Sequence, residues 1–114
     1  MNRYIIDGLI ADLHNGKRIV IVAPTVRQSS FAFRTIADAM SNDEAVSKIR
    51  RANGQESITT HTGGYLTFIA VSMYGGRGFY ADTVVALSPG QMTDKQVLAL
   101  LSYTRVTQAE LIQA

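Results

Sequence analysis

The spacing of apolar residues along the chain predicts three amphipathic helices. In each, the apolar side chains recur three or four positions apart, which places them on one side of a helix. The first is followed by Gly16, a residue suited to the left-handed cap of a helix, and the second has Ser29 or Ser30 as its N-cap candidate. Thr93 is the N-cap candidate of the third. The three predicted helices are residues 2–15, about 29–40 and 92–104.

Five other segments have the composition of β-strands, with β-branched or apolar residues over most of their length. Pro24 ends the first of them, and the tight-turn composition Thr62-Gly63-Gly64 joins the second to the third. The five predicted strands are residues 18–24, 56–61, 65–72, 83–87 and 109–114. Strands that alternate with helices predict an α/β fold with a three-layer sheet, here with one local β-hairpin.

Residues 41–54 carry two competing signals. A Ser or Asn cap, acidic residues at the start and basic residues at the end match the charge preferences of a short helix. Asn53-Gly54 is also a preferred turn of a β-hairpin, which would make the preceding residues a strand. We expect the helix and keep the hairpin as the alternative.

Composition narrows the classes of function. A chain of 114 residues with 46% hydrophobic residues fits one compact domain, residues 1–114. Without cysteine there is no thiolate metal site, and His14 and His61 stand at unrelated positions, so we expect no metal and no cofactor. No apolar run is long enough to span a bilayer, and the first residues lack the plan of a signal peptide, so we expect a cytoplasmic protein with no membrane partner.

The order of segments resembles the ATPase core of phage terminase large subunits, within the wider group of helicase-like P-loop ATPases. Three stretches carry the resemblance: "GKRIVIVAPTVRQSSFAF" (16–33), "NGQESITTHTGGYLTFIAVSMYGGRGFYAD" (53–82) and "TVVALSPGQMTDKQVLALL" (83–101). The resemblance implies a small RecA-like, P-loop NTPase-like sheet, and a phage-encoded protein of the host cytoplasm. It covers nearly the whole chain but only the middle of the family's ATPase domain, so it also implies a truncated domain that lacks the first strand and the phosphate loop.

The chain departs from the family pattern at both halves of the nucleotide site. Its only Gly-Lys pair, Gly16-Lys17, is followed by Arg18 in place of Ser or Thr and leads into a strand where a phosphate loop should follow one. Where the family has an acidic pair after the strand at 83–87, this chain has Leu87 and Ser88. The resemblance therefore implies a degenerate ATPase site, without a phosphate-binding lysine, a magnesium anchor or a water-activating base. We expect no catalytic residues, and we favour, without deciding it, the interpretation that the chain is not an enzyme.

Seven residues are candidates for contacts with nucleic acid. Thr25, Arg27 and Gln28 follow the end of a predicted core strand, where open α/β sheets place ligand-binding residues and where helicase-like relatives contact the nucleic-acid backbone. Arg77 lies in a glycine-rich loop that suits an anion. The remaining candidates are Lys48, Arg50 and Arg51. Each also has an ordinary reading: helix capping for Thr25, solvation for Arg27 and Arg77, and compensation of a helix dipole for the basic cluster.

The net charge is only +2, with a pI of about 9.2, so the placement of the basic residues must decide for or against nucleic acid. We expect a non-catalytic, terminase-like module that binds nucleic acid. One alternative is a regulatory or self-assembling module: in the family's sheet order the missing strand would lie beside Glu110–Ala114, which leaves that edge for a protein partner or a second copy. The other alternative is a residual nucleotide-binding NTPase.

Overall fold

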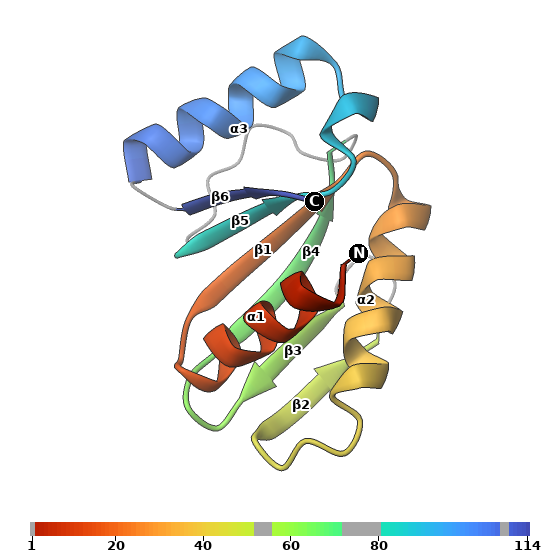
Figure 1. Ribbon diagram of the computed structural model, residues 1–114, viewed down its shortest axis with the longest axis vertical. Helices are drawn as coiled ribbons and strands as arrows, with labels where there is room; N and C mark the ends of the chain where they lie inside the picture. The colour runs from red at the N-terminus through yellow and green to blue at the C-terminus, as the bar shows by residue number, and fades with distance from the viewer. Residues whose placement is uncertain (1, 52–55, 72–80, 108–109) are drawn as a thin grey trace.

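The computed structural model describes residues 2–51, 56–71, 81–107 and 110–114, and it shows a six-stranded mixed sheet flanked by helices (Figure 1). The elements are α1 (Arg3–His14), β1 (Arg18–Ala23), α2 (Val26–Ala39), β2 (Val46–Arg50), β3 (Ser57–Thr60), β4 (Tyr65–Ala70), β5 (Thr83–Ala86), a short 3₁₀ helix (Pro89–Gln91), α3 (Asp94–Thr107) and β6 (Glu110–Gln113). The strand order is β2-β3-β4-β1-β5-β6. Strands β4, β1, β5 and β6 are parallel to one another, whereas β2, β3 and β4 pair antiparallel. The predicted α/β class and the β3–β4 hairpin are confirmed.

Two hydrophobic cores lie on opposite faces of this sheet. Helices α1 and α2 pack on the first face, where Leu9, Phe33 and Ile36 meet strand residues such as Ile21. Helix α3 packs on the second face, where Leu100 meets Val84. In Figure 1, α1 lies in front of the sheet, α2 runs along its right-hand side, and α3 lies at the β5–β6 side. Because each face is buried under helices along the central strands, β1 and β5 are apolar almost throughout.

The predicted helix over residues 41–54 is wrong, because residues 46–50 form strand β2, which pairs antiparallel with β3. The Asp43 carboxylate accepts the main-chain N–H of Ala45 at 2.9 Å and so stabilises a turn before the strand. Val46 and Ile49 then pack against the first core. Strand pairing and burial of these two side chains outweigh the helix-like order of charges. The alternative turn at Asn53-Gly54 lies outside the described residues.

The caps of the two later helices follow one prediction and correct the other. Helix α2 begins earlier than expected, since Thr25 is its N-cap and accepts the N–H of Gln28 at 3.2 Å, while Ser29 is buried within the first turns. Thr93 precedes α3 as predicted, and its hydroxyl accepts the N–H of Gln96 at 3.1 Å. The Gln96 side chain accepts the Thr93 N–H in return at 2.9 Å, a reciprocal capping arrangement.

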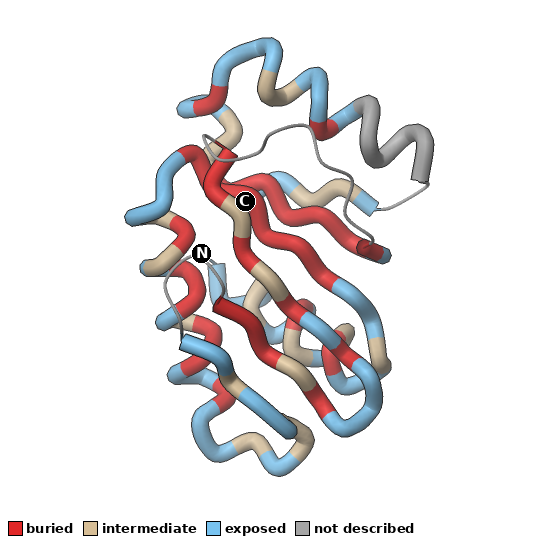
Figure 2. Tube along the Cα trace, turned by 180° about the vertical axis from the view of Figure 1, so that it is seen from behind, coloured by how far each residue is buried: buried red, intermediate tan, exposed pale blue. Residues whose placement is uncertain are grey.

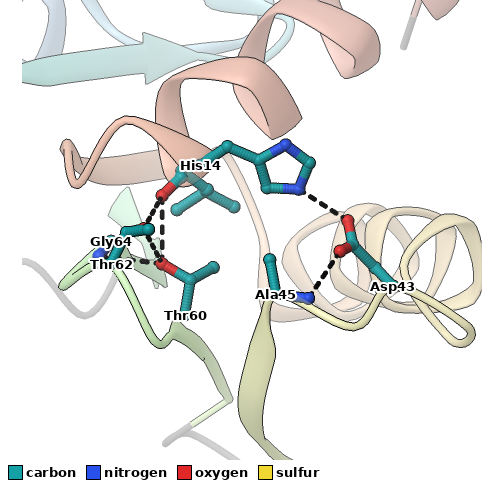
Figure 3. A network of polar contacts seen from close by, with 7 residues as sticks. His14, Asp43, Ala45, Thr60, Thr62 and Gly64 are labelled. Carbon is teal, nitrogen blue, oxygen red and sulfur yellow. Dashed lines mark hydrogen bonds and ion pairs between the residues drawn. The ribbon is translucent and has the colours of Figure 1, made fainter.

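The C-terminal end of α1 is fixed to the turn between β3 and β4 (Figure 3). The hydroxyls of Thr60 and Thr62 each donate to the main-chain oxygen of Leu13 at 3.0 Å, and the N–H of Gly64 donates to the Thr60 hydroxyl at 2.9 Å. A Cβ atom at Gly64 would overlap the Leu13 oxygen and would come within 2.6 Å of the Thr60 hydroxyl. This close approach requires glycine. It adds two hydroxyl donors to a carbonyl in the last turn of α1 that also accepts the N–H of Gly16 at 3.1 Å.

Candidate functional site

The carboxyl ends of β1, β5 and β6 meet at one edge of the sheet because these strands are parallel. The N–H of Leu87 donates to Val22 at 2.8 Å, and the N–H of Ser88 donates to Ala114 at 2.8 Å, so the three chain segments remain bonded just past the strand ends. This edge is where open α/β sheets bind their ligands. The carboxyl ends of these strands are therefore the expected position of a ligand-binding site.

Leu87 and Ser88 give this edge an apolar and conformationally unusual character. The Leu87 side chain is 9% exposed and belongs to the core beneath α2. Ser88 has φ 45° and ψ 55°, a left-handed conformation that is uncommon outside glycine, and it leads into the 3₁₀ helix at Pro89. Neither side chain can anchor a magnesium ion as a carboxylate would.

A pocket of about 250 Å³ opens between α2 and the ends of β5 and β6. It is lined by Gln28, Phe31, Ala32, Thr35, Leu87, Ser88 and Ala114. No side chain in this lining is charged, and Phe31 exposes 63% of its surface beside it. A polyphosphate requires cations or several N–H donors, so the described lining suits an apolar group better than a nucleotide.

Thr25 and Gln28 are engaged in holding this edge together. The Thr25 hydroxyl donates to the Gln28 side-chain oxygen at 3.1 Å, in addition to its capping bond. The Gln28 amide then donates to the Gln91 side-chain oxygen at 2.9 Å and ties α2 to the 3₁₀ helix. The Arg27 side chain is exposed and makes no hydrogen bond or ion pair with the residues that the structure describes. Of these three candidates, Arg27 has the side chain most available to a ligand.

Lys48 and Arg50 lie on edge strand β2 and Arg51 follows its last residue, so the expected position at the end of a helix is wrong. Because side chains alternate along a strand, Lys48 and Arg50 face one side of the sheet and Arg51 faces the other. The Arg51 guanidinium lies 5.7 Å from the centre of the Phe33 ring, against α2. Lys48 and Arg50 are both exposed on the face opposite α1 and α2. The fold therefore groups Lys48 with Arg50, but not with Arg27 or Arg51, and Arg77 lies outside the described residues.

Tyr65 is a candidate that the sequence argument missed. It is 41% exposed and lies on the same face as Lys48, since β4 alternates between core residues such as Leu66 and residues of the opposite face. The alternation of residues 65–70 carried this signal, because Leu66 and Phe68 mark the core-facing positions. The sequence did not indicate which part of that opposite face is left uncovered by α3.

Among the described ranges, no three His, Cys, Asp or Glu residues come together in a way that could hold a metal ion. None of the helices in the described part of the chain has the length and apolar character needed to cross a membrane.

Comparison with known proteins gives a fold and no closer relation. No family model matches the chain, and no curated protein matches it. Among solved structures it is similar to the large terminase of a thermophilic bacteriophage, at 15% identity and a TM-score of 0.68, over 95% of this chain and 29% of that one. It is also similar to the complex of that phage terminase with ADP, at 13% identity and a TM-score of 0.64, over 88% of this chain and 26% of that one.

A third similar structure is the large terminase ATPase domain of Thermus phage P74-26, at 12% identity and a TM-score of 0.63, over 96% of this chain and 50% of that one. The chain thus spans half or less of the length of these structures. The described six-stranded sheet and three α-helices are therefore similar in fold to part of a large-terminase ATPase domain.

Proposed function

We propose that this chain is a terminase-like module without a competent ATPase site, and that it binds nucleic acid. The observation that carries the first part is the burial of Leu87 under α2 at the point where a metal-binding carboxylate would be needed. Without that carboxylate, the described strand ends have no group that anchors magnesium or activates water for phosphoryl transfer.

The position of the Gly-Lys pair supports the same conclusion. Gly16 and Lys17 precede β1, with Gly16 at φ 77° in the turn after α1. They lie at the amino end of this strand, whereas Leu87 lies at the carboxyl ends. The six residues of β1 separate the amino ends of the strands from their carboxyl ends by about 20 Å. Lys17 is therefore too far from the strand ends to neutralise a phosphate bound there.

Nucleic acid is supported by the exposure of the basic residues. Arg27, Lys48 and Arg50 are all exposed, and cations of this kind attract phosphates with release of counterions. A module that has lost phosphoryl-transfer chemistry keeps this electrostatic capacity, because it needs only surface charge and no precise geometry.

The test combines two measurements on the same protein. ATP with magnesium should leave the melting temperature unchanged and should not be hydrolysed above background. A ligand at a hundredfold excess over its dissociation constant adds about 2.7 kcal/mol to the stability of the folded state, which would raise the melting temperature by about ten degrees. A shift of several degrees would instead support residual nucleotide binding. Nucleic acid should bind at low salt and weaken steeply as salt rises, and no binding at tens of micromolar protein would contradict the second part.

A second candidate function, self-association, is favoured by the edge at β6. This strand is the outermost of the described sheet on its side. The N–H groups of Glu110 and Ala114 bond inward to β5, so the intervening N–H groups of Leu111 and Gln113 point outward. A cavity of about 390 Å³ lies between α1 and β6, lined by Tyr4, Ile5, Gly8, Leu9, Asp12, Glu110 and Ile112. A strand from a second copy would bond to this edge and fill the cavity with its side chains.

A further inference from the structure

One half of the second sheet face has no described helix over it. Helix α3 covers the part formed by β1, β5 and β6, where Val97 and Leu100 pack on the strands. Helices α1 and α2 pack on the opposite face. Figure 2, which views the molecule from behind, shows the strands of the remaining part in front, with α3 to one side of them. We call this part, formed by β2, β3 and β4 on the side away from α1 and α2, the open face.

Strand register defines which residues the open face carries. Lys48 pairs with Thr59, and Thr59 pairs with Tyr65, so these three form one row across the sheet. The next row is Arg50, Ser57 and Thr67. The alternate residues of the same strands, among them Ile58 and Leu66, belong to the first core on the other side. The open face therefore carries two exposed cations and one exposed tyrosine, with the partly exposed Thr59 and Thr67 and the buried Ser57 between them.

The charge of the open face has a single sign. Neither row contains an acidic side chain, and Lys48 and Arg50 are both exposed on the edge strand. Their Cα atoms lie two residues apart on one strand, about 7 Å. The row of Lys48 continues across β1 to Arg18, where the Asp82 carboxylate accepts the Arg18 main-chain N–H at 2.9 Å. The positive potential of the face is thus strongest at the β2 side, away from that carboxylate.

Tyr65 gives the open face a surface on which a base can stack. Its side chain is 41% exposed, and its hydroxyl has no partner among the described residues. It lies two strands away from Lys48 in the same row, about 10 Å. Sheets that bind single-stranded nucleic acid use this combination, with an exposed aromatic ring for a base and nearby cations for the phosphates. A duplex keeps its bases stacked internally and could use only the cations.

We infer that the open face binds single-stranded nucleic acid, with Tyr65 stacking on a base and with Lys48 and Arg50 holding the adjacent phosphates. This inference rests on the proposed nucleic-acid function and assigns it a surface and a class of ligand. The readout is fluorescence anisotropy with labelled oligothymidylate, with the corresponding oligouridylate and with a duplex of the same length.

Wild-type protein should prefer either single strand to the duplex. Replacement of Tyr65 by alanine should weaken single-strand binding by about 5- to 150-fold, the range found for loss of one base-stacking side chain, whereas Tyr65→Phe should retain binding. Lys48→Gln should reduce the slope of log affinity against log salt by about 0.7, as expected for one lost phosphate contact on a single strand. A comparison of the two oligonucleotides distinguishes DNA from RNA as the source of the strand.

A matched control for Lys48→Gln lies on the other side of the molecule. Arg34 is exposed on α2, so Arg34→Gln removes a cation from the opposite side. This control variant should bind as the wild type does. Melting temperatures of all variants show whether a loss of binding comes from a loss of folding.

The outcomes distinguish the open face, the proposed nucleic-acid function and the class of ligand from one another. Normal single-strand binding by folded Tyr65→Ala and Lys48→Gln would overturn the open face as the site and leave the proposed function standing. No binding to any nucleic acid would overturn the proposed function itself. Equal or tighter binding to the duplex, or equal competition by polyglutamate, would overturn single-stranded nucleic acid as the ligand.

Discussion

Replacement of Leu87 by aspartate tests whether the carboxyl ends of the strands still suit a metal-binding site. The substitution puts a carboxylate at the position where the resemblance to terminases implies an acidic residue. In this chain the side chain is 9% exposed and packs in the core beneath α2. We therefore expect Leu87→Asp to fold less stably and to gain no affinity for magnesium or nucleotide.

The magnitude has two parts. Loss of a buried leucine side chain costs about 1.5–3 kcal/mol of apolar burial. Desolvation raises the pKa of a buried carboxyl group, and each unit of pKa difference between folded and unfolded states is worth about 1.4 kcal/mol. Because the pocket beside Leu87 is open to solvent, we expect the pKa of the introduced carboxyl group to rise by only about one or two. The total destabilisation at pH 7 is then about 3–6 kcal/mol, a large share of the stability of a typical domain.

Urea unfolding at pH 7 and pH 5 measures both parts. A carboxyl group whose folded-state pKa is raised destabilises the protein at pH values above its unfolded pKa. That penalty shrinks as the pH falls towards the unfolded value, because the folded state then keeps its proton. Leu87→Asn is the matched control, since it loses the same apolar contacts but cannot ionise. The difference between the two variants should be larger at pH 7 than at pH 5.

Two results would refute the reasoning. A loss below about 1 kcal/mol for Leu87→Asp would mean that the side chain at this position turns towards solvent. Recovery of stability in millimolar magnesium, with no such effect on Leu87→Asn, would mean that the strand ends still form a metal site. The second result would also contradict the proposed loss of ATPase capacity.

Three other predictions concern the fold and the β6 edge. Gly64→Ala should destabilise the protein by about 3 kcal/mol in urea unfolding because its Cβ would overlap the end of α1, whereas Gly8→Ala, with open space around its Cβ, should stabilise it by about 0.5–1 kcal/mol; equal effects would contradict this. The Ala45 N–H and then the His14 side chain lower the pKa of Asp43, so its stabilising contribution is present above the unfolded pKa and is lost as pH falls through the folded one. Wild type should therefore lose its advantage over Asp43→Asn in urea titrations taken below about pH 4, and an advantage independent of pH would exclude a charge effect. Light scattering should show a dimer that Gln113→Pro converts to monomer, since this proline removes an N–H on the outer edge; wild type that stays monomeric at all concentrations would remove the self-association proposal.

Sequence patterns predicted most elements of the fold because most of them are specified by local periodicity. The stripe of α1 and the apolar runs of β1 and β5 appear in the structure within a few residues of their predicted bounds. Strand β2 was only the second choice for its segment, because its identity depends on a partner strand and on burial of Val46 and Ile49, and neither is visible in its own order of charges. The start of α2 was left open for a related reason: Thr25, Ser29 and Ser30 were all candidates for its cap, and only the backbone conformation selects Thr25.

The candidate site was less predictable than the fold. The sequence identified the basic residues, but whether they act together depends on the face that each one occupies. Arg51 turns to Phe33 on one side of β2 while Lys48 lies on the other. Tyr65 joins Lys48 only through the register of two strand pairs, which no single segment specifies.

The two outer strands of the described sheet differ in how readily they would extend it. Strand β2 has a register shift between Val46 and Lys48, and its outer residues include a lysine and an arginine. Irregular pairing and like charges oppose uncontrolled strand addition, which is how natural sheets avoid aggregation at an edge. Strand β6 pairs in regular register and presents the main-chain N–H groups of Leu111 and Gln113 outward. Growth of this sheet should therefore stop after one added copy, because the only edge of the described sheet then left on each molecule is the one protected by β2. A closed dimer, and not a fibre, is the expected product at high protein concentration.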